Sequence, residues 1–251
     1  MTLIIAVLAA VALIDGAIAA APEQRCDVPE SFLSSDSDLT GVMKEIKAQQ
    51  RLDISVVGTG SSALPGPDGE RFAYPAQLEQ ALKQQLPGIT VKVTAHVAPR
   101  ATTAEMAAGL AKILADDRPA LVIWQTGTAD AMNGVEPEDF RTSLDDGVGT
   151  IDNGSADVIL MNMQYSPHTE SMLDVSTYAD IMHWVAQQHA ALLFDRLGIM
   201  RNWNDSGTFD LYTATKDYDM ARRVHDCIGR ALASQIISAS HLDALRVQTT
   251  R

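Results

Sequence analysis

The chain has 251 residues, of which 46% are hydrophobic and 20% are charged, the balance of an ordinary folded domain large enough to bury a core. It carries 32 acidic and 19 basic residues, a formal net charge of −13, and only 5% aromatic residues. A nucleic-acid-binding protein needs a cluster of Lys and Arg, and no such cluster stands out, so that class of partner is excluded.

The first 21 residues have the pattern of a secretory signal peptide. An apolar run from Leu3 to Ile14 is followed by small residues that form an A-x-A cleavage site, Ala17 and Ala19 among them. The run is shorter than the roughly 20 apolar residues that a membrane-spanning helix needs, which favours cleavage over a membrane anchor. We therefore expect a periplasmic or secreted bacterial protein with no stable membrane anchor after cleavage.

Two cysteines, Cys26 and Cys227, stand near opposite ends of the remaining chain. In an oxidising compartment they can form a disulfide that closes nearly the whole chain into one loop, which stabilises the fold by roughly 4–5 kcal/mol in the loop-entropy model. The alternative is a pair of buried free thiols. We predict the disulfide.

Residues 22–37 are polar and contain Pro and Ser, and we interpret them as an extended N-terminal arm. Beyond them, short apolar runs rich in Val and Ile alternate with helical patterns, as expected for strands buried on both faces of a parallel sheet. We predict five strands, at Ile54–Val57, Ile89–Val93, Leu121–Trp124, Val158–Met161 and Leu192–Phe194.

Local signals mark the helices between these strands. Pro75 suits the first turn of one helix, and Pro87-Gly88 ends it. Capping-box patterns at Thr102 with Glu105, and at Thr177 with Asp180, predict two helix starts, and a long last helix is expected over 217–237. Alternating strands and helices predict a doubly wound, flavodoxin-like α/β/α sandwich over residues 38–240, followed by a tail at 241–251.

Ligands of an open parallel sheet collect at the carboxyl ends of its strands. The first strand is followed by Gly58-Thr59-Gly60-Ser61-Ser62, whose small residues allow a sharp turn that presents a hydroxyl. No Lys follows as in a P-loop, and the G-x-G-x-x-G spacing of dinucleotide sites is absent. A nucleophilic serine is one interpretation, and a tight turn without chemistry is the other.

The third strand leads into Gly127-Thr128-Ala129-Asp130, and here the sequence resembles a known family. Gly-Thr-x-Asp after a hydrophobic strand is similar to the G-T-N-D block of SGNH/GDSL hydrolases, and Gly60-Ser61-Ser62 is similar to their G-D-S block. The likeness covers residues 25–238. It implies the SGNH fold, no cofactor, and a serine esterase or O-deacylase that acts on small-molecule or glycan acyl esters.

The resemblance places the nucleophile at Ser62 if Gly60-Ser61-Ser62 matches G-D-S. Aligning from Gly58 instead puts Gly60 at the nucleophile position and leaves Ser61 next to it, so Ser61 is the second candidate. That neither serine is a nucleophile is the third possibility.

The oxyanion hole of the family uses the serine N–H, a glycine and the Asn of the third block. The glycine position falls on Ala101, whose backbone N–H can replace it, and the neighbouring Arg100 can bind an anionic substrate or lie solvated at the surface.

In the third block, Gly127 and Thr128 offer further contacts to an oxyanion or substrate. Ala129 replaces the Asn, a loss that typically costs about 10²–10³ in rate. Asp130 keeps the acidic position of the family, and we expect it to anchor its turn rather than to catalyse.

The resemblance implies a base in a D-x-x-H motif before the last helix, but residues 216–219 contain no histidine. His225 is the nearest candidate, although it falls inside the expected helix. His168 after the fourth strand, also a candidate for substrate binding, and His96 at the end of the second strand are the others. A lone histidine is more often structural, and no metal-binding spacing occurs, so we predict no metal site.

Two functions remain open. One is an exported esterase with Ser62 as nucleophile. The other is a binding or scaffold protein of the cell envelope that keeps the SGNH-like cleft without hydrolysis.

Overall fold

A computed structural model describes residues 26–34, 37–213 and 218–243. The proposed signal peptide, residues 22–25 and 35–36 of the arm, and most of the tail lie outside the described residues. In the parts of the chain that are described, no helix is both long and apolar enough to cross a membrane.

The core is a five-stranded, all-parallel sheet in the order β2-β1-β3-β4-β5. The predicted strands are all present, and the first two are longer than expected. Their bounds are β1 Arg51–Gly58, β2 Thr90–Val97, β3 Leu121–Gln125, β4 Asp157–Met161 and β5 Leu192–Phe194. Every residue of the central β3 is buried, because helices cover both faces of the sheet.

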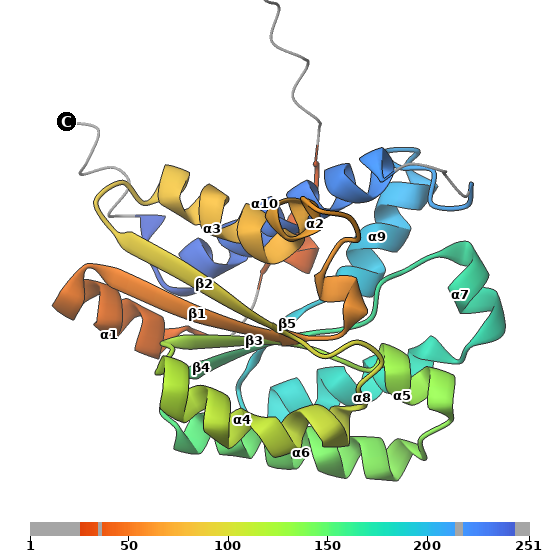
Figure 1. The fold of residues 1–251 in the computed structure, drawn as a ribbon, viewed down its shortest axis with the longest axis horizontal. Coiled ribbons are helices and arrows are strands. Elements are labelled where there is room, and N and C mark those ends of the chain that lie inside the picture. The colour runs from red at the N-terminus through yellow and green to blue at the C-terminus, as the bar shows by residue number, and fades with distance from the viewer. Residues whose placement is uncertain (1–25, 35–36, 214–217, 244–251) are drawn as a thin grey trace, which may run out of the picture.

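Figure 1 shows these two helical layers. One face is covered by α2 (Gly69–Phe72), α3 (Tyr74–Gln85), α9 (Arg196–Asp205) and α10 (Asp219–Ala239). The other is covered by α4 (Thr103–Asp117), α5 (Thr128–Asn133), α6 (Pro137–Asn153) and α8 (Val175–Gln188). The remaining helical elements are η1 (Glu30–Phe32), α1 (Thr40–Gln49), η2 (Gly60–Ser62) and α7 (Pro167–Met172). The predicted doubly wound α/β/α sandwich is confirmed.

The helix signals were correct at two starts and wrong at one. Pro75 lies in the first turn of α3, and Thr102 with Glu105 forms the capping box of α4. The prediction of a start at Thr177 is wrong, because Asp174 caps α8 three residues earlier by accepting from the Thr177 N–H. The last helix begins and ends two residues later than expected, at Asp219 and Ala239.

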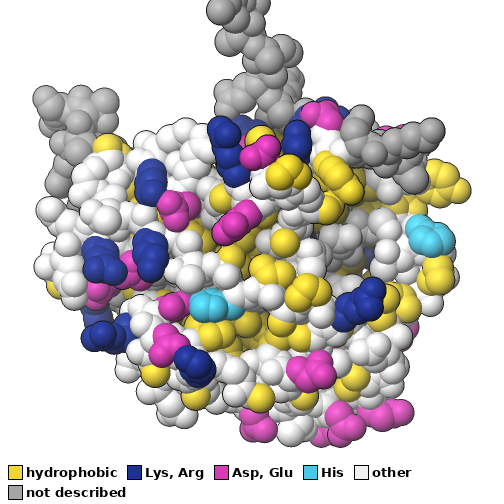
Figure 2. Space-filling view, viewed as in Figure 1, with side chains coloured by type: hydrophobic (Ala, Val, Ile, Leu, Met, Phe, Trp, Pro, Cys, Tyr) yellow, Lys and Arg dark blue, Asp and Glu magenta, His cyan; other side chains and the backbone are white. Residues whose placement is uncertain are grey.

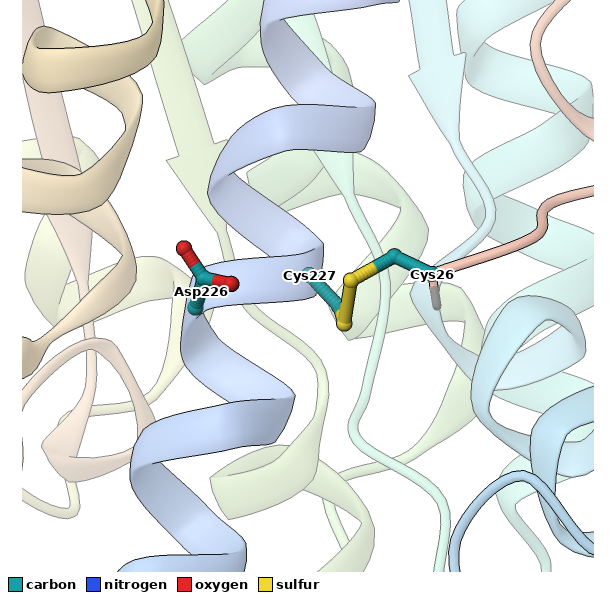
Figure 3. A group of neighbouring side chains, drawn as sticks. All are labelled: Cys26, Asp226 and Cys227. Atoms are coloured by element: carbon teal, nitrogen blue, oxygen red, sulfur yellow. A yellow bond between two sulfur atoms is a disulfide. The ribbon is translucent and has the colours of Figure 1, made fainter. Parts of the chain in front are cut away.

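The predicted disulfide joins Cys26 to Cys227 of α10, with a Cα–Cα distance of 5.2 Å (Figure 3). Asp226 lies beside it, and these three residues are near enough for a metal-binding group. Both sulfurs are committed to the disulfide, however, and the Arg230 Nη2 lies 2.7 Å from both the Cys26 Sγ and the Asp226 Oδ2. The group therefore offers no thiolate to a metal and already holds a cation.

Candidate functional site

The loop after β1 is held by one side chain of β3. The Oε1 of Gln125 accepts from the Thr59 N–H at 2.9 Å and from the hydroxyls of Thr59 at 3.0 Å, Ser61 at 3.2 Å and Ser62 at 2.9 Å. Because β1 and β3 are adjacent parallel strands, their carboxyl ends bring these residues together. The amide oxygen thus orders both candidate serines.

Ser62 is buried, with an exposed fraction of 1%, and its hydroxyl also lies 2.9 Å from the Tyr74 hydroxyl. Burial raises the pKa of Tyr74 to about 12, against the opposing effects of the Ser62 hydrogen bond and the Arg196 charge. The phenol is therefore protonated at neutral pH, so it is a hydrogen-bond partner of Ser62 and not a base for it.

Ser61 lies beside a buried cation that the sequence reasoning missed. Arg196, the first residue of α9, is 1% exposed, and its Nη2 and Nη1 donate to the Ser61 hydroxyl at 3.1 Å and the Ser61 carbonyl at 3.4 Å. Burial lowers the pKa of Arg196 to about 10. The available signal was its position, since an arginine soon after β5 lies at the same edge of the sheet as the loop after β1.

Gly60 occupies the exposed position at the tip of β1. A Cβ built at Gly60 would have the Pro99 Cβ, 3.9 Å away, as its nearest neighbour, so a side chain fits there without a clash. The exposed position after Gly58-Thr59 is therefore a glycine, whereas Ser61 is half-buried and Ser62 is buried.

His225 does not reach either serine. It lies within α10, is 6% exposed, and its Nδ1 accepts from the backbone N–H of Tyr74 at 2.9 Å. Burial, with a smaller contribution from the Arg196 charge, lowers the pKa of His225 to about 3. In this structure the neutral ring joins α10 to α3, and no hydrogen bond connects it to either serine.

The other histidine candidates make no hydrogen bond to either serine. The Nε2 of His96 lies 2.6 Å from the Asp117 carboxylate, which also accepts from the Ser55 hydroxyl. His168 is exposed in α7. All six histidines of the sequence fall within the described residues, and none hydrogen-bonds to Ser61 or Ser62. The other three have partners elsewhere: Gln187 for His183, Asp145 and Asp152 for His189, and Asp38 for His241.

The expected oxyanion donors are only partly available. The N–H of Ala101 donates to the Ala98 carbonyl at 3.1 Å and is therefore engaged within its own turn. Arg100 is exposed on the same turn with a φ of 64°. Gly127 has a φ of 96°, and a Cβ there would lie 2.5 Å from the Met163 sulfur, which requires a glycine. The hydroxyl of Thr128 is buried without a partner in the described chain.

Asp130 anchors more than its own turn. Its carboxylate accepts from the Thr103 N–H at 3.0 Å and from the Thr103 hydroxyl at 2.9 Å. Burial raises the pKa of Asp130, and these hydrogen bonds oppose that rise. The acidic position that resembles the family motif therefore ties α5 to the start of α4.

A cleft of about 750 Å³ opens beside Ser62. Its walls are the loop that follows η2, the helix α2, the first half of α3 and the edge strand β2. The residues that line it include Ser62, Leu64, Pro75, Val93, Ala95 and Val97. No sequence pattern pointed to this cleft, because its walls come from segments that meet only in the folded chain.

The fold and the blocks around it define the class of an SGNH/GDSL-like hydrolase. A profile of the Non-GDSL lipase-like family matches residues 25–242, and the chain belongs to this family.

Solved structures share the fold at low sequence identity. LAE5, an α/β hydrolase enzyme from the metagenome of Lake Arreo in Spain, is 17% identical with a TM-score of 0.57, over 76% of this chain and 95% of its own. Axe2, an acetylxylan esterase from Geobacillus stearothermophilus, is 13% identical with a TM-score of 0.57, over 75% and 94%. The acetyl xylan esterase AlAXEase is 14% identical with a TM-score of 0.57, over 75% and 99%. Among curated proteins, none matches the sequence significantly.

Proposed function

We propose that this chain is a ligand-binding member of the Non-GDSL lipase-like family that uses its cleft without hydrolysing an ester. The observation that carries the proposal is the tip of β1, where Gly60 is exposed while both serines are bound by Gln125, Tyr74 and Arg196.

Acyl transfer needs a nucleophile with a base in hydrogen-bond reach. The two partners of the Ser62 hydroxyl are an amide oxygen and a phenol whose pKa is about 12. An amide oxygen is a very weak base, and the protonated phenol has no capacity to accept the serine proton at neutral pH. The hydrogen bonds around Ser62 therefore support a structural role for its hydroxyl and not a nucleophilic one.

The neighbouring blocks support the same proposal. Ala129 supplies no side-chain donor to an oxyanion, and the N–H of Ala101 is used within its own turn. Removing one such donor typically costs about 10²–10³ in rate. The cleft itself is retained at about 750 Å³, within the usual size range of ligand sites.

A second candidate function is an exported serine esterase or O-deacylase. One observation favours it, because Ser62 lines the cleft. It requires a rearrangement that frees the Ser62 hydroxyl and brings a histidine, His168 or His225, to it. The substrate would be a small-molecule or glycan acyl ester, and Axe2 is an acetylxylan esterase.

The two functions are separated by a fluorophosphonate probe. We expect no adduct in the intact mass of the folded protein and no release of nitrophenol from p-nitrophenyl acetate above that of Ser62→Ala. An active serine hydrolase labelled in parallel is the positive control. A stoichiometric adduct on the peptide that carries Ser61 and Ser62, absent in Ser62→Ala, would establish the esterase instead.

Export is part of the proposal. The Cys26–Cys227 disulfide supports it, because such bonds persist in oxidising compartments. N-terminal sequencing of the protein from the periplasm or medium is expected to begin at residue 22, and an intact Met1 on cell-associated protein would contradict export.

A further inference from the structure

The strand β2 lies at one edge of the sheet, with β1 as its single partner in the described chain. The Thr90 N–H donates to the Gln50 carbonyl, and the Ala98 N–H donates to the Gly58 carbonyl. Backbone polar groups alternate in direction along a strand, so those of every second residue point away from β1. These outward residues are Val91, Val93, Ala95 and Val97.

The cleft of about 750 Å³ lies along this outward edge. Val93, Ala95 and Val97 all line it, together with Leu64 and Pro75. Figure 1 shows β2 in front of the other strands, beneath α3, and Figure 2 shows hydrophobic side chains gathered across the middle of this face with charged ones around them. The edge of the sheet is therefore one wall of the cleft.

One outward amide already has a partner. The Oε2 of Glu79, from α3, accepts from the Val93 N–H at 2.7 Å, in the place where the carbonyl of a further strand would lie. Farther along β2, the N–H groups of Ala95 and Val97 have no such acceptor among the described residues. They are the donors that a further strand would find at the open part of the cleft.

We propose that the cleft binds an extended, basic polypeptide segment that pairs with Ala95 and Val97 as a sixth strand. The inference deepens the proposed ligand-binding function and rests on it. Main-chain hydrogen bonds to a free edge give affinity, and pockets for alternate side chains give specificity. Here the apolar wall at Val93, Ala95 and Leu64 suits alternate apolar side chains.

The charge at the cleft indicates a basic ligand. Three carboxylates line it, those of Asp68, Glu70 and Glu79, against the guanidinium of Arg71, and Glu79 is also paired with Lys83 of the same helix. The whole chain carries a formal charge of −13, which attracts a cationic partner over a longer range.

The test uses a fluorescein-labelled peptide of about nine residues, long enough to span β2, with Val at every second position and Lys or Thr between. We expect saturable binding by fluorescence anisotropy and slower hydrogen exchange at Ala95 and Val97 in the bound protein. The same peptide with Glu in place of Lys is expected to bind at least about tenfold more weakly.

Two variants at one position separate main-chain pairing from other contacts. Ala95→Pro removes the outward N–H without removing a hydrogen bond to β1, and proline is tolerated on edge strands. We expect it to weaken the binding by about tenfold, the loss of a hydrogen bond in a desolvated site, whereas Ala95→Ser keeps the N–H and the affinity. An unchanged melting temperature shows that both variants fold.

Absence of saturable binding to the folded wild-type protein would overturn the inference, and so would equal binding by Ala95→Pro. The fluorophosphonate experiment reports separately on the proposed function. An adduct on Ser62 together with peptide protection at Ala95 would refute the non-hydrolytic function and retain the docking site. No adduct and no peptide binding would refute the docking site alone.

Discussion

At the scale of single residues, the environment of each polar group decides its chemistry more than its place in a motif. Ser62 follows the expected strand, yet it is buried and shared between Gln125 and Tyr74. Arg196 is equally buried and donates to Ser61. Gln125 holds the whole loop through one oxygen, while its Nε2 is buried without a partner in the described chain. These are the features of a rigid polar cluster behind the strand tip.

His225 gives a prediction about pH. Its pKa is lowered from 6.5 to about 3 in the folded protein, so below pH 6.5 the unfolded chain binds a proton that the folded chain does not. The stability contributed by the neutral ring is complete above pH 6.5 and is lost as the pH falls toward 3, by about 1.4 kcal/mol per pH unit at most.

We expect His225→Asn, whose side-chain oxygen can still accept from the Tyr74 N–H, to flatten this dependence between pH 6.5 and pH 4. Urea unfolding at several pH values measures it. His241→Asn is the matched control, because His241 is an exposed histidine that hydrogen-bonds to Asp38 at the surface. Equal slopes in wild type and His225→Asn would contradict the assignment of a neutral buried ring.

At the scale of elements, side-chain hydrogen bonds between neighbouring helices and strands hold those elements in place. Two sets of hydrogen bonds satisfy the polar groups at the start of α4. One is its own capping box of Thr102 and Glu105, and the other is made by the carboxylate of Asp130 from α5. On the edge strand β2, Glu79 of α3 likewise accepts from the Val93 N–H. Asp130 and Glu79 thus each accept from a backbone N–H of another element.

Asp130→Ala is expected to lower the free energy of unfolding by about 2–3 kcal/mol, because it leaves the buried N–H of Thr103 without its acceptor and removes one of the two partners of the Thr103 hydroxyl, the other being the Thr126 hydroxyl. Asp130→Asn keeps one oxygen and is expected to lose less than half of that. Urea unfolding of both variants at neutral pH measures the difference. Similar losses in the two would show that charge, and not the hydrogen bond to Thr103, is the source of stability.

At the scale of the whole molecule, the disulfide closes a loop with a sequence separation of 201 residues. It fixes the segment before η1 to α10, and the Trp203 indole N–H donates to the Asp27 carbonyl of the same segment. The cross-link acts mainly by restricting the unfolded chain, so its effect is expected on the free energy of unfolding more than on the cleft.

Reduction, or the double variant Cys26→Ser and Cys227→Ser, is expected to lower the free energy of unfolding by up to about 5 kcal/mol. Binding to the cleft is expected to persist in the molecules that remain folded. Denaturant unfolding with and without reductant measures the loss, and the double variant must be insensitive to reductant. Equal stability of the oxidised and reduced wild-type protein would contradict this prediction.

Local patterns in the sequence were sufficient for the layers of the fold. The five strands are short apolar runs that can be recognised from neighbouring residues alone, and the capping box of Thr102 and Glu105 involves residues only three positions apart. The likeness of Gly127-Thr128-Ala129-Asp130 to a hydrolase block led to the correct family. With only two cysteines, the disulfide had a single possible pairing.

The tertiary structure alone decided which polar groups meet. The distance along the chain from Ser62 to Gln125 is 63 residues, and from Ser61 to Arg196 it is 135 residues. No local periodicity encodes such encounters, since they follow from the order of the strands in the sheet. The burial that makes His225 neutral, and the cleft beside β2, also result from packing between segments that are distant in the sequence. The sequence by itself determined the elements, because they depend on near neighbours, and packing determined the site, because burial and hydrogen-bond partners depend on distant ones.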